Sequence, residues 1–233
     1  DYSSSTSTLS ANWTASADAE SGISRYWYAI GTTPGGTELS ETFPGNCNSC
    51  GNNTTGLTIL HPDELSFTRT GLSLEEGQTY YITIRADNGA GLFTTKTSDG
   101  IKIDTTPPTL STATISSLTQ ITLNFTEANA LNATTAQNIA NYTVTDTNTN
   151  FPSVTDSVSV SSATLSASSE VTLLISGMTS QPDEVYQITI SNVTDLAGNP
   201  INPNPTNATA TQQNFYCPGW QVTTDADSGI GSL

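Results

Sequence analysis

Basic side chains are scarce in this chain of 233 residues, which carries five lysines and arginines against 21 acids and a net charge of -16. All five bases precede residue 103, and the last of them is Lys102. Because lysine and arginine are the side chains that neutralise phosphates, we expect neither nucleic acid nor an anionic membrane surface as a partner. Divalent cations are compatible with this charge.

Groups that perform catalysis are equally scarce, since the chain has one histidine and three cysteines. His61 precedes a proline and Asp63 in a loop-forming sequence, and no Gly-x-Ser-x-Gly motif supplies a nucleophile. The acids include no pair at a spacing typical of glycosidases. We therefore predict that the chain has no catalytic residues and is not an enzyme.

Long apolar runs are also missing, and none approaches the ~20 residues that span a bilayer, so we expect no membrane insertion. Hydrophobic residues make up 34% and charged residues only 11% of the chain. Thr, Ser and Asn take the place of charges, as is common in secreted β proteins. The length suits two domains of sandwich size.

Residues 74–89 carry the strongest structural signal, because apolar side chains alternate with polar ones as in a strand with one buried face. The face that we expect to be buried carries Tyr80, Ile82, Ile84 and Ala86. The face that we expect to meet water carries Tyr81, Thr83, Arg85 and Asp87.

A leucine and Gly77 just before Tyr80 resemble a tyrosine corner, in which the phenol hydroxyl bonds to nearby backbone. With residues 9–13, including Trp13, as strand B and residues 26–30 as strand C, the segment of about 5–104 resembles a fibronectin type III domain. Three segments resemble the variant of this domain found in large secreted and surface proteins of bacteria: 18–23, 30–36 and 98–104. The resemblance implies a β-sandwich and says little about activity.

Residues 105–109 contain the pair Pro107 and Pro108, which we interpret as a short, stiff linker between domains 1–104 and 110–213. Beyond it, we expect one or two helical turns over 134–139, a turn at 195–199, and strands at 121–127, 142–145, 157–165, 171–175 and 185–193. Residues of about 108–213 resemble the bacterial Ig-like domains of surface-layer and adhesin proteins. The predicted fold class is therefore all-β, with two tandem Ig-like or fibronectin type III-like sandwiches.

The two ends of the chain suggest exchange between copies. Residues 1–8 are short and polar, so strand A of the first sandwich is expected to be missing, truncated or supplied by another segment. Residues 220–230 repeat residues 13–23 at an offset of 207 positions, with the same Trp, Asp, Ala, Ser, Gly and Ile. We interpret the tail 214–233 as the start of another fibronectin type III-like domain or as a donor strand.

Calcium is the ligand that the sequence favours. Asp18-x-Glu20 and Asp225-x-Asp227 place paired carboxylates on turns that contain glycine, and hard cations take oxygen ligands from such loops. Neither segment has the spacing of an EF-hand, and carboxylates that cap turns are the alternative. The expected ligands are Asp18, Glu20, Asp87, Asp104, Asp195, Asp225 and Asp227.

Cys47 and Cys50 lie in a loop rich in Gly and Asn, where we predict a local disulfide. A zinc site is the alternative, although only Cys217 and His61 remain as further ligands. Cys217 is expected to stay free, to pair outside this chain or to link subunits.

The sequence predicts a structural or adhesive module of an extracellular bacterial surface protein, secreted or at the cell surface. It would associate with copies of itself or with neighbouring repeats, as a subunit of a fibre or surface layer, with Trp220 and Cys217 in the assembling segment. The alternative is an accessory module of a secreted hydrolase that binds polysaccharide. Host cells and polysaccharides are the further ligands to consider, and three aromatic side chains expected to be exposed would serve them: Trp27, Tyr81 and Trp220.

Overall fold

The computed structural model describes residues 1–39, 59–147, 157–179 and 184–212. These residues form strands almost throughout, which confirms the predicted all-β class. The chain divides into two compact units. The first comprises residues 1–106 with 196–199, and the second comprises residues 107–195 and those from 200 onward.

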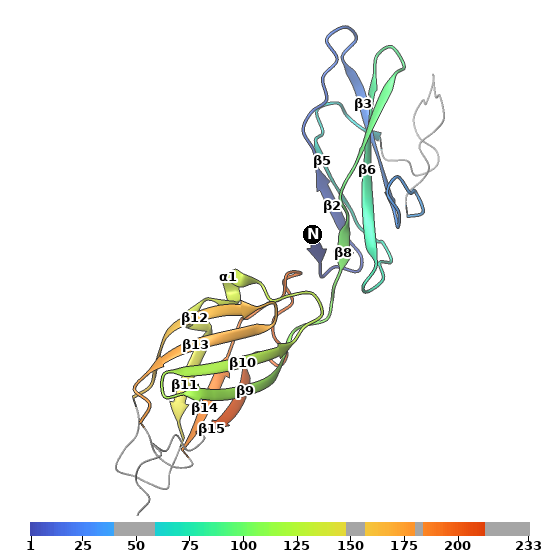
Figure 1. The fold of residues 1–233 in the computed structure, drawn as a ribbon. Coiled ribbons are helices and arrows are strands. Elements are labelled where there is room, and N and C mark those ends of the chain that lie inside the picture. The colour runs from blue at the N-terminus through green and yellow to red at the C-terminus, as the bar shows by residue number, and fades with distance from the viewer. Residues whose placement is uncertain (40–58, 148–156, 180–183, 213–233) are drawn as a thin grey trace, which may run out of the picture. The chain divides into compact units, whose positions relative to one another are not determined.

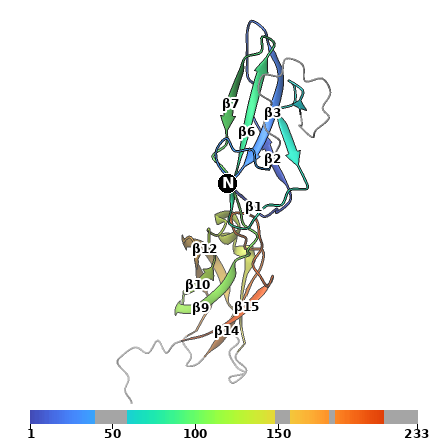
Figure 2. The same cartoon turned by 90° about the vertical axis from the view of Figure 1, so that its right-hand side faces the viewer.

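The first unit is a sandwich of a large and a small sheet (Figures 1 and 2). The small sheet pairs β2 (Leu9–Asn12) with β5 (Ser66–Arg69). The large sheet has the order β1-β8-β6-β3-β4, and β7 also pairs with β6. Its strands are β1 (Tyr2–Ser3), β3 (Ile23–Gly31), β4 (Ile59–Leu60), β6 (Thr79–Asn88), β7 (Phe93–Thr97) and β8 (Ile101–Ile103).

Apolar side chains of the two sheets meet in the core of the first sandwich. Leu9 of β2 and Ile30 of β3 are fully buried there. Trp13 meets the ring of Tyr26 edge-on, with centroids 5.5 Å apart, and Phe67 of β5 stacks on Tyr28 at 3.8 Å. Trp13 is the expected core tryptophan of strand B. It packs against this core and is partly buried.

The turn before β6 has the hydrogen bond that a tyrosine corner predicts. The backbone N–H of Glu75 donates to Tyr80 Oη at 3.0 Å, and the Tyr80 ring is buried. Gly77 takes a positive φ of 76°, where a side chain would be strained, and its N–H donates to the carbonyl of Ile103. The corner thus joins the start of β6 to the end of β8.

The outer face of β6 differs from the expectation that it meets water. Thr83 and Arg85 are buried, because both have partners on that face. Arg85 lies over the ring of Phe93 with its Cζ 3.9 Å from the centroid, and its Nε donates to Asp87 at 2.6 Å. The hydroxyl groups of Thr83 and Thr97 form a hydrogen bond. The alternation identified the strand correctly but not what covers its polar face.

The N-terminal residues supply a strand of only two residues to the large sheet. In β1, Tyr2 pairs with Lys102 in parallel, and the carbonyl of Asp1 accepts a hydrogen bond from the Lys102 N–H. The next residues then cross to the small sheet, where the carbonyls of Thr6 and Ser7 accept hydrogen bonds from residues that follow β5. The described strands add nothing to the other edge of β2.

The second unit is a sandwich of four strands on three (Figure 1). One sheet has the order β12-β13-β10-β9, from β9 (Thr109–Ser117), β10 (Gln120–Thr126), β12 (Ser159–Ala167) and β13 (Glu170–Ser176). The other has the order β11-β14-β15, from β11 (Tyr142–Asp146), β14 (Val185–Ile190) and β15 (Thr206–Thr211).

Alternation along the central strands builds the second core. Fully or almost fully buried side chains occur at every second position of β10, β13 and β14. They are Ile121, Leu123, Phe125, Val171, Leu173, Ile175, Tyr186, Ile188 and Ile190.

The predicted helical turns are α1 (Ala133–Ala136) and a 3₁₀ turn, η1 (Ile139–Asn141). Asn132 caps α1 by accepting from the Thr134 N–H, as amide side chains commonly do at helix starts. Tyr142 donates its hydroxyl to the carbonyl of Ala136 at 2.6 Å, and burial raises the pKa of this phenol. The turns therefore lead directly into β11.

Replacing Tyr80 by phenylalanine should destabilise the first sandwich by about 1 kcal/mol, because the Glu75 N–H loses its acceptor while the ring stays in place. Chemical denaturation of the two chains would measure the difference. Tyr81→Phe is the matched control, since that side chain points to the other face of β6. Equal stability of the Tyr80→Phe chain and the wild type would contradict the structural role of the corner.

Candidate functional site

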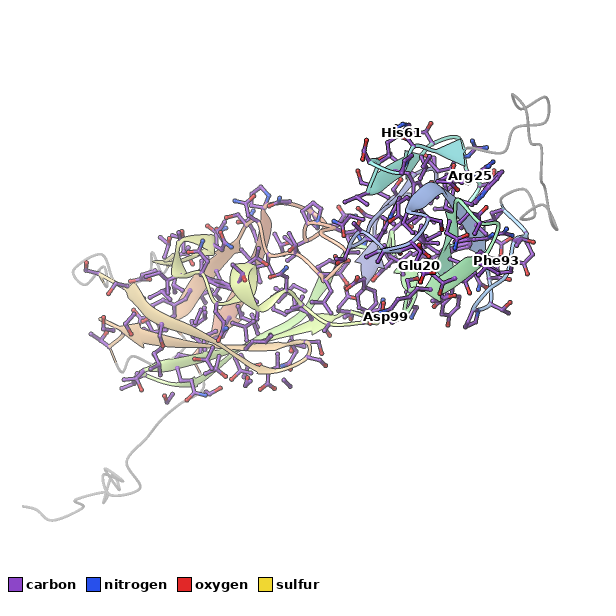
Figure 3. The ribbon with its side chains drawn as sticks, turned by 90° about the horizontal axis from the view of Figure 1, so that it is seen from above. Glu20, Arg25, His61, Phe93 and Asp99 are labelled. Carbon is purple, nitrogen blue, oxygen red and sulfur yellow. The ribbon has the colours of Figure 1, made fainter. Side chains whose placement is uncertain are left out.

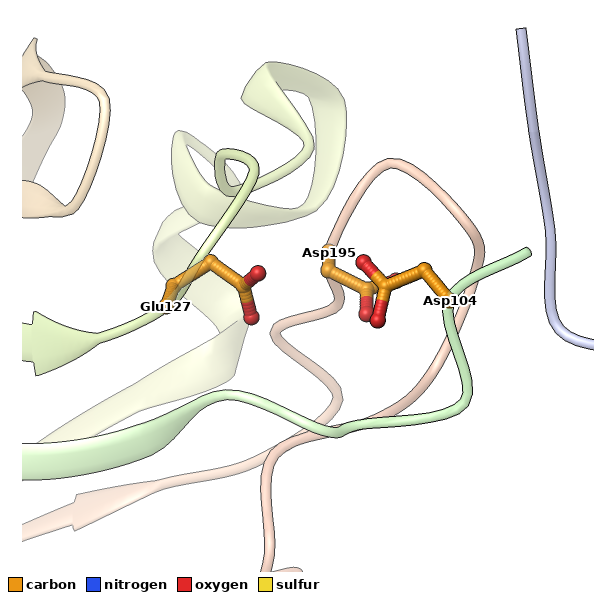
Figure 4. A group of neighbouring side chains, drawn as sticks. All are labelled: Asp104, Glu127 and Asp195. Atoms are coloured by element: carbon orange, nitrogen blue, oxygen red, sulfur yellow. The ribbon is translucent and has the colours of Figure 1, made fainter. Parts of the chain in front are cut away.

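Two carboxylates of the second unit lie close together (Figure 4). Glu127 directly follows β10, and Asp195 follows a segment that Thr135 holds by accepting the Thr194 N–H at 3.0 Å. Oxygens of the two carboxylates lie within 4.8 Å of each other, and Asp195 is fully buried. Glu127 also accepts the N–H of Asn129 at 2.9 Å.

Two ionised carboxylates at this separation repel each other, and burial of Asp195 strengthens the repulsion. A bound cation with a preference for oxygen ligands would compensate for such repulsion. Asp195 is among the calcium ligands expected from the sequence, whereas Glu127 is not. The only sequence signal for Glu127 is its place at the end of a predicted strand, which gives no hint of Asp195 far along the chain.

Asp104, another expected ligand, follows β8 and is buried in the first unit. Its carboxylate accepts the Thr106 N–H at 3.1 Å, and its carbonyl accepts the side-chain amide of Asn199 at 2.7 Å. Thr105, which follows Asp104, donates its hydroxyl and its N–H to the carboxylate of Glu76. These hydrogen bonds lower the pKa of Glu76.

Asp18 caps a turn. Its Oδ1 accepts the backbone N–H of Ser21 at 2.7 Å and of Glu20 at 3.1 Å, and its Oδ2 accepts the side-chain amide of Asn88. The hydrogen bond from the Ser21 backbone is the largest cause that lowers the pKa of Asp18 to about 2. The geometry matches the turn-capping alternative, because both carboxylate oxygens are already occupied by donors.

Asp87 is engaged in the same way on the outer face of β6. One of its oxygens accepts from Arg85, and the other accepts the indole N–H of Trp27 at 2.9 Å. A cation would have to compete with Arg85 for these oxygens. Trp27 is only 2% exposed, so the expectation that this ring is free to stack on sugars is wrong. Asp87 of β6 accepts its indole N–H, and the Arg25 guanidinium lies over the ring.

His61 lies at the surface of the first sandwich (Figure 3). Its side chain is 68% exposed, and Nδ1 lies 3.3 Å from a carboxylate oxygen of Asp63. The backbone N–H of His61 donates to Glu64, which closes the loop on itself. These contacts fit a surface loop, as the sequence predicts.

Several expected site residues lie outside the part of the chain that the structure describes, and their roles stay predictions. They are Cys47, Cys50, Cys217, Trp220, Asp225 and Asp227. Within the described residues, no helix has the length and apolar character needed to cross a membrane.

Residues 103–190 match the sequence model of a family described as a putative flagellar system-associated repeat. The match covers less than half of the chain; it includes Asp104 and Glu127 and ends before Asp195. No curated protein sequence gave a match. The second sandwich is therefore similar to a repeat unit.

Three solved structures resemble the chain weakly. The N-terminal part of the bacterial S-layer protein SbsC is 16% identical, covers 46% of this chain and 24% of its own, with a TM-score of 0.38. Domains 1–6 of the surface layer protein SbsC are 17% identical and cover 46% of this chain and 14% of their own, with a TM-score of 0.39. The chicken CNTN1 FN1–FN3 domains are 12% identical and cover 91% of this chain and 62% of their own, with a TM-score of 0.39. This chain spans less than two thirds of each of them, and likenesses at these TM-scores carry no functional argument.

The capping role of Asp18 predicts a pH dependence. Its pKa in the folded chain lies below its ordinary value of 3.8, so its contribution to stability is present above about pH 4 and is lost as the pH falls through about 2. Asp18→Ala should therefore be less stable than the wild type at pH 7, and the difference should shrink between pH 4 and pH 2.

Denaturation curves across this range, with NMR titration of the Asp18 carboxyl carbon, measure both effects. Asp18→Asn is the control, because it keeps an acceptor for the turn but does not titrate. A carboxyl titration midpoint near 4 would rule out the capping explanation.

Proposed function

We propose that the chain is a non-enzymatic structural module of an extracellular bacterial surface protein, built to be repeated. The observation that carries the proposal is the similarity of residues 103–190 to a family of repeats. A sandwich of a second kind precedes it in the same chain, so the repeating unit would contain both. The description of that family also names the flagellar system, which is consistent with a surface location.

The partners in this proposal are further copies of the same unit. The repeat of residues 13–23 in residues 220–230 supports it, because a new sandwich of the first type would then begin after the second one. The low content of charged side chains, with Thr, Ser and Asn in their place, fits an extracellular setting. An adhesive role remains part of the proposal.

The sharper form of the proposal is strand exchange, in which the C-terminal segment of one copy completes the first sandwich of the next. It gains support from β2, one edge of which has no partner among the described strands. Free strand edges accept extended segments through backbone hydrogen bonds.

Deletion of residues 214–233 should abolish assembly and leave both sandwiches folded, because the described residues of both cores precede the deleted segment. Negative-stain electron microscopy would follow the assemblies, and circular dichroism would follow the fold. Filaments or sheets that survive the deletion would eliminate strand exchange and leave a repeat held together by other contacts.

We also propose that the module binds calcium, with Glu127 and Asp195 among the ligands. The support is the proximity of two carboxylates, one of them fully buried. Calcium at 100 times its dissociation constant would stabilise the folded chain by about 2.7 kcal/mol.

Thermal unfolding with excess calcium and with a chelator tests this proposal. We expect calcium to raise the Tm of the wild type and of Glu20→Gln, but not that of Asp195→Asn. A calcium effect that is lost in Glu20→Gln and kept in Asp195→Asn would move the site to the turn at Asp18. No effect in the wild type would reject calcium altogether.

A further inference from the structure

The first sandwich has an open side between β2 and β7. Among the described strands, β2 pairs only with β5 and β7 pairs only with β6, so both strands present a free edge. A groove of about 470 Å³ lies between them. A second hollow of about 400 Å³ adjoins it and shares part of its lining, including Ala11 and Ile82.

The groove has an apolar floor and a polar lip. Inward-facing side chains of β6 line it, and Ala11 and Trp13 line it from the side of β2. On β7, Lys96 stands opposite Ile84 and Thr94 stands opposite Ala86, so polar side chains occupy the matching face of that strand. An extended segment with one apolar face fits such a site.

Trp13 adds a hydrogen-bond donor that has no acceptor. Its Nε1 is buried and has no partner among the described residues, although an indole N–H is a donor that is usually paired when buried. The indole of Trp27, by contrast, donates to Asp87. Since Trp13 lines the groove, a carbonyl of an inserted segment would supply the missing acceptor.

We propose that this groove receives residues 214–224 of a second copy of the chain as an added strand. The inference rests on the proposed strand exchange and assigns its acceptor site. The inserted segment would pair with the free edge of β2, cover the β6 side chains Ile82 and Ile84, and accept the Trp13 N–H.

The sequence of the tail suits this place. Residues 213–233 follow the described end of the second sandwich and reach roughly 70 Å when extended, enough to extend into a neighbouring copy. Within them Trp220 and Val222 alternate with a polar residue. Residues 214–224 carry no charge, but Asp225 and Asp227 follow them directly and the tail has no base, whereas Lys96 is an exposed base at the groove.

Sedimentation velocity of full-length chains at low ionic strength tests the proposal with three variants. Lys96→Glu changes the acceptor groove, and Trp220→Asp changes the donor segment. Arg69→Glu is the matched control, because it makes the same change of charge at an exposed base that does not line the groove. We expect association to weaken at least tenfold in the first two variants and to stay unchanged in the control.

NMR of the indole N–H groups in the wild-type chain provides a second measurement. On raising the concentration from monomer to assembly, the Trp13 signal should shift downfield and exchange more slowly with solvent. The Trp27 signal should stay in place, because its hydrogen bond to Asp87 lies within one copy.

The outcomes separate the groove from strand exchange itself. A wild type that stays monomeric, or a Trp220→Asp chain that still associates, would overturn both. Loss of association in Trp220→Asp, with full association of Lys96→Glu and an unmoved Trp13 signal, would overturn the groove alone and leave strand exchange standing. Weakening in Arg69→Glu equal to that in Lys96→Glu would show that general charge, not the groove, controls association.

Discussion

Alternation of apolar and polar side chains along the strands is the constraint on which the rest of this molecule depends. In the second sandwich it turns Leu123, Leu173 and Ile188 into a common core, and two sheets of four and three strands cover that core. In the first sandwich the same alternation faces a small sheet to which the described residues contribute two strands. Two strands cannot cover the whole inner face of β6, and the groove beside Trp13 follows from that shortage.

The outer face of β6 shows how a chain with few bases uses one of them. Arg85 is nearly buried, and burial of a charge is costly unless a partner compensates for it. Asp87 supplies the compensating charge, Phe93 covers the guanidinium, and Trp27 donates to the same carboxylate. The three strands β3, β6 and β7 are thereby joined by side chains as well as by their backbones. Arg25, labelled with Phe93 in Figure 3, extends this arrangement over Trp27.

The sequence predicts the central strands well, and it misses several strands that have a neighbour on one side only. Strands β10 and β13 are buried at every second residue, so their pattern is strong. Strands β9, β15 and β7 lie at sheet edges or pair on one side only, and they consist largely of Thr, Ser and Ala. A side chain that is not buried need not be apolar, so the period of two fades where a strand has little to cover.

The candidate site shows the same limit. Asp195 could be singled out because its turn has a recognisable sequence, but its neighbour Glu127 is set by how β10 and the segment after β14 meet in space. The burial of Trp27 could not be predicted either. The sequence of a strand that carries a tryptophan is the same whether other side chains cover that face of the sheet or leave it exposed. Local patterns specify elements, and tertiary pairing decides which side chains become neighbours.

The parallel pairing of β1 with β8 has a mechanical consequence. Asp1 and Asp104 stand at opposite ends of this pair, joined across it by hydrogen bonds from Lys102 to Asp1 and from Asp104 to Ser3. A pull on the two ends of the first sandwich slides the strands along each other, so these bonds bear the load together instead of opening one after another. Tension would thus enter the sandwich through β1, a strand of only two residues.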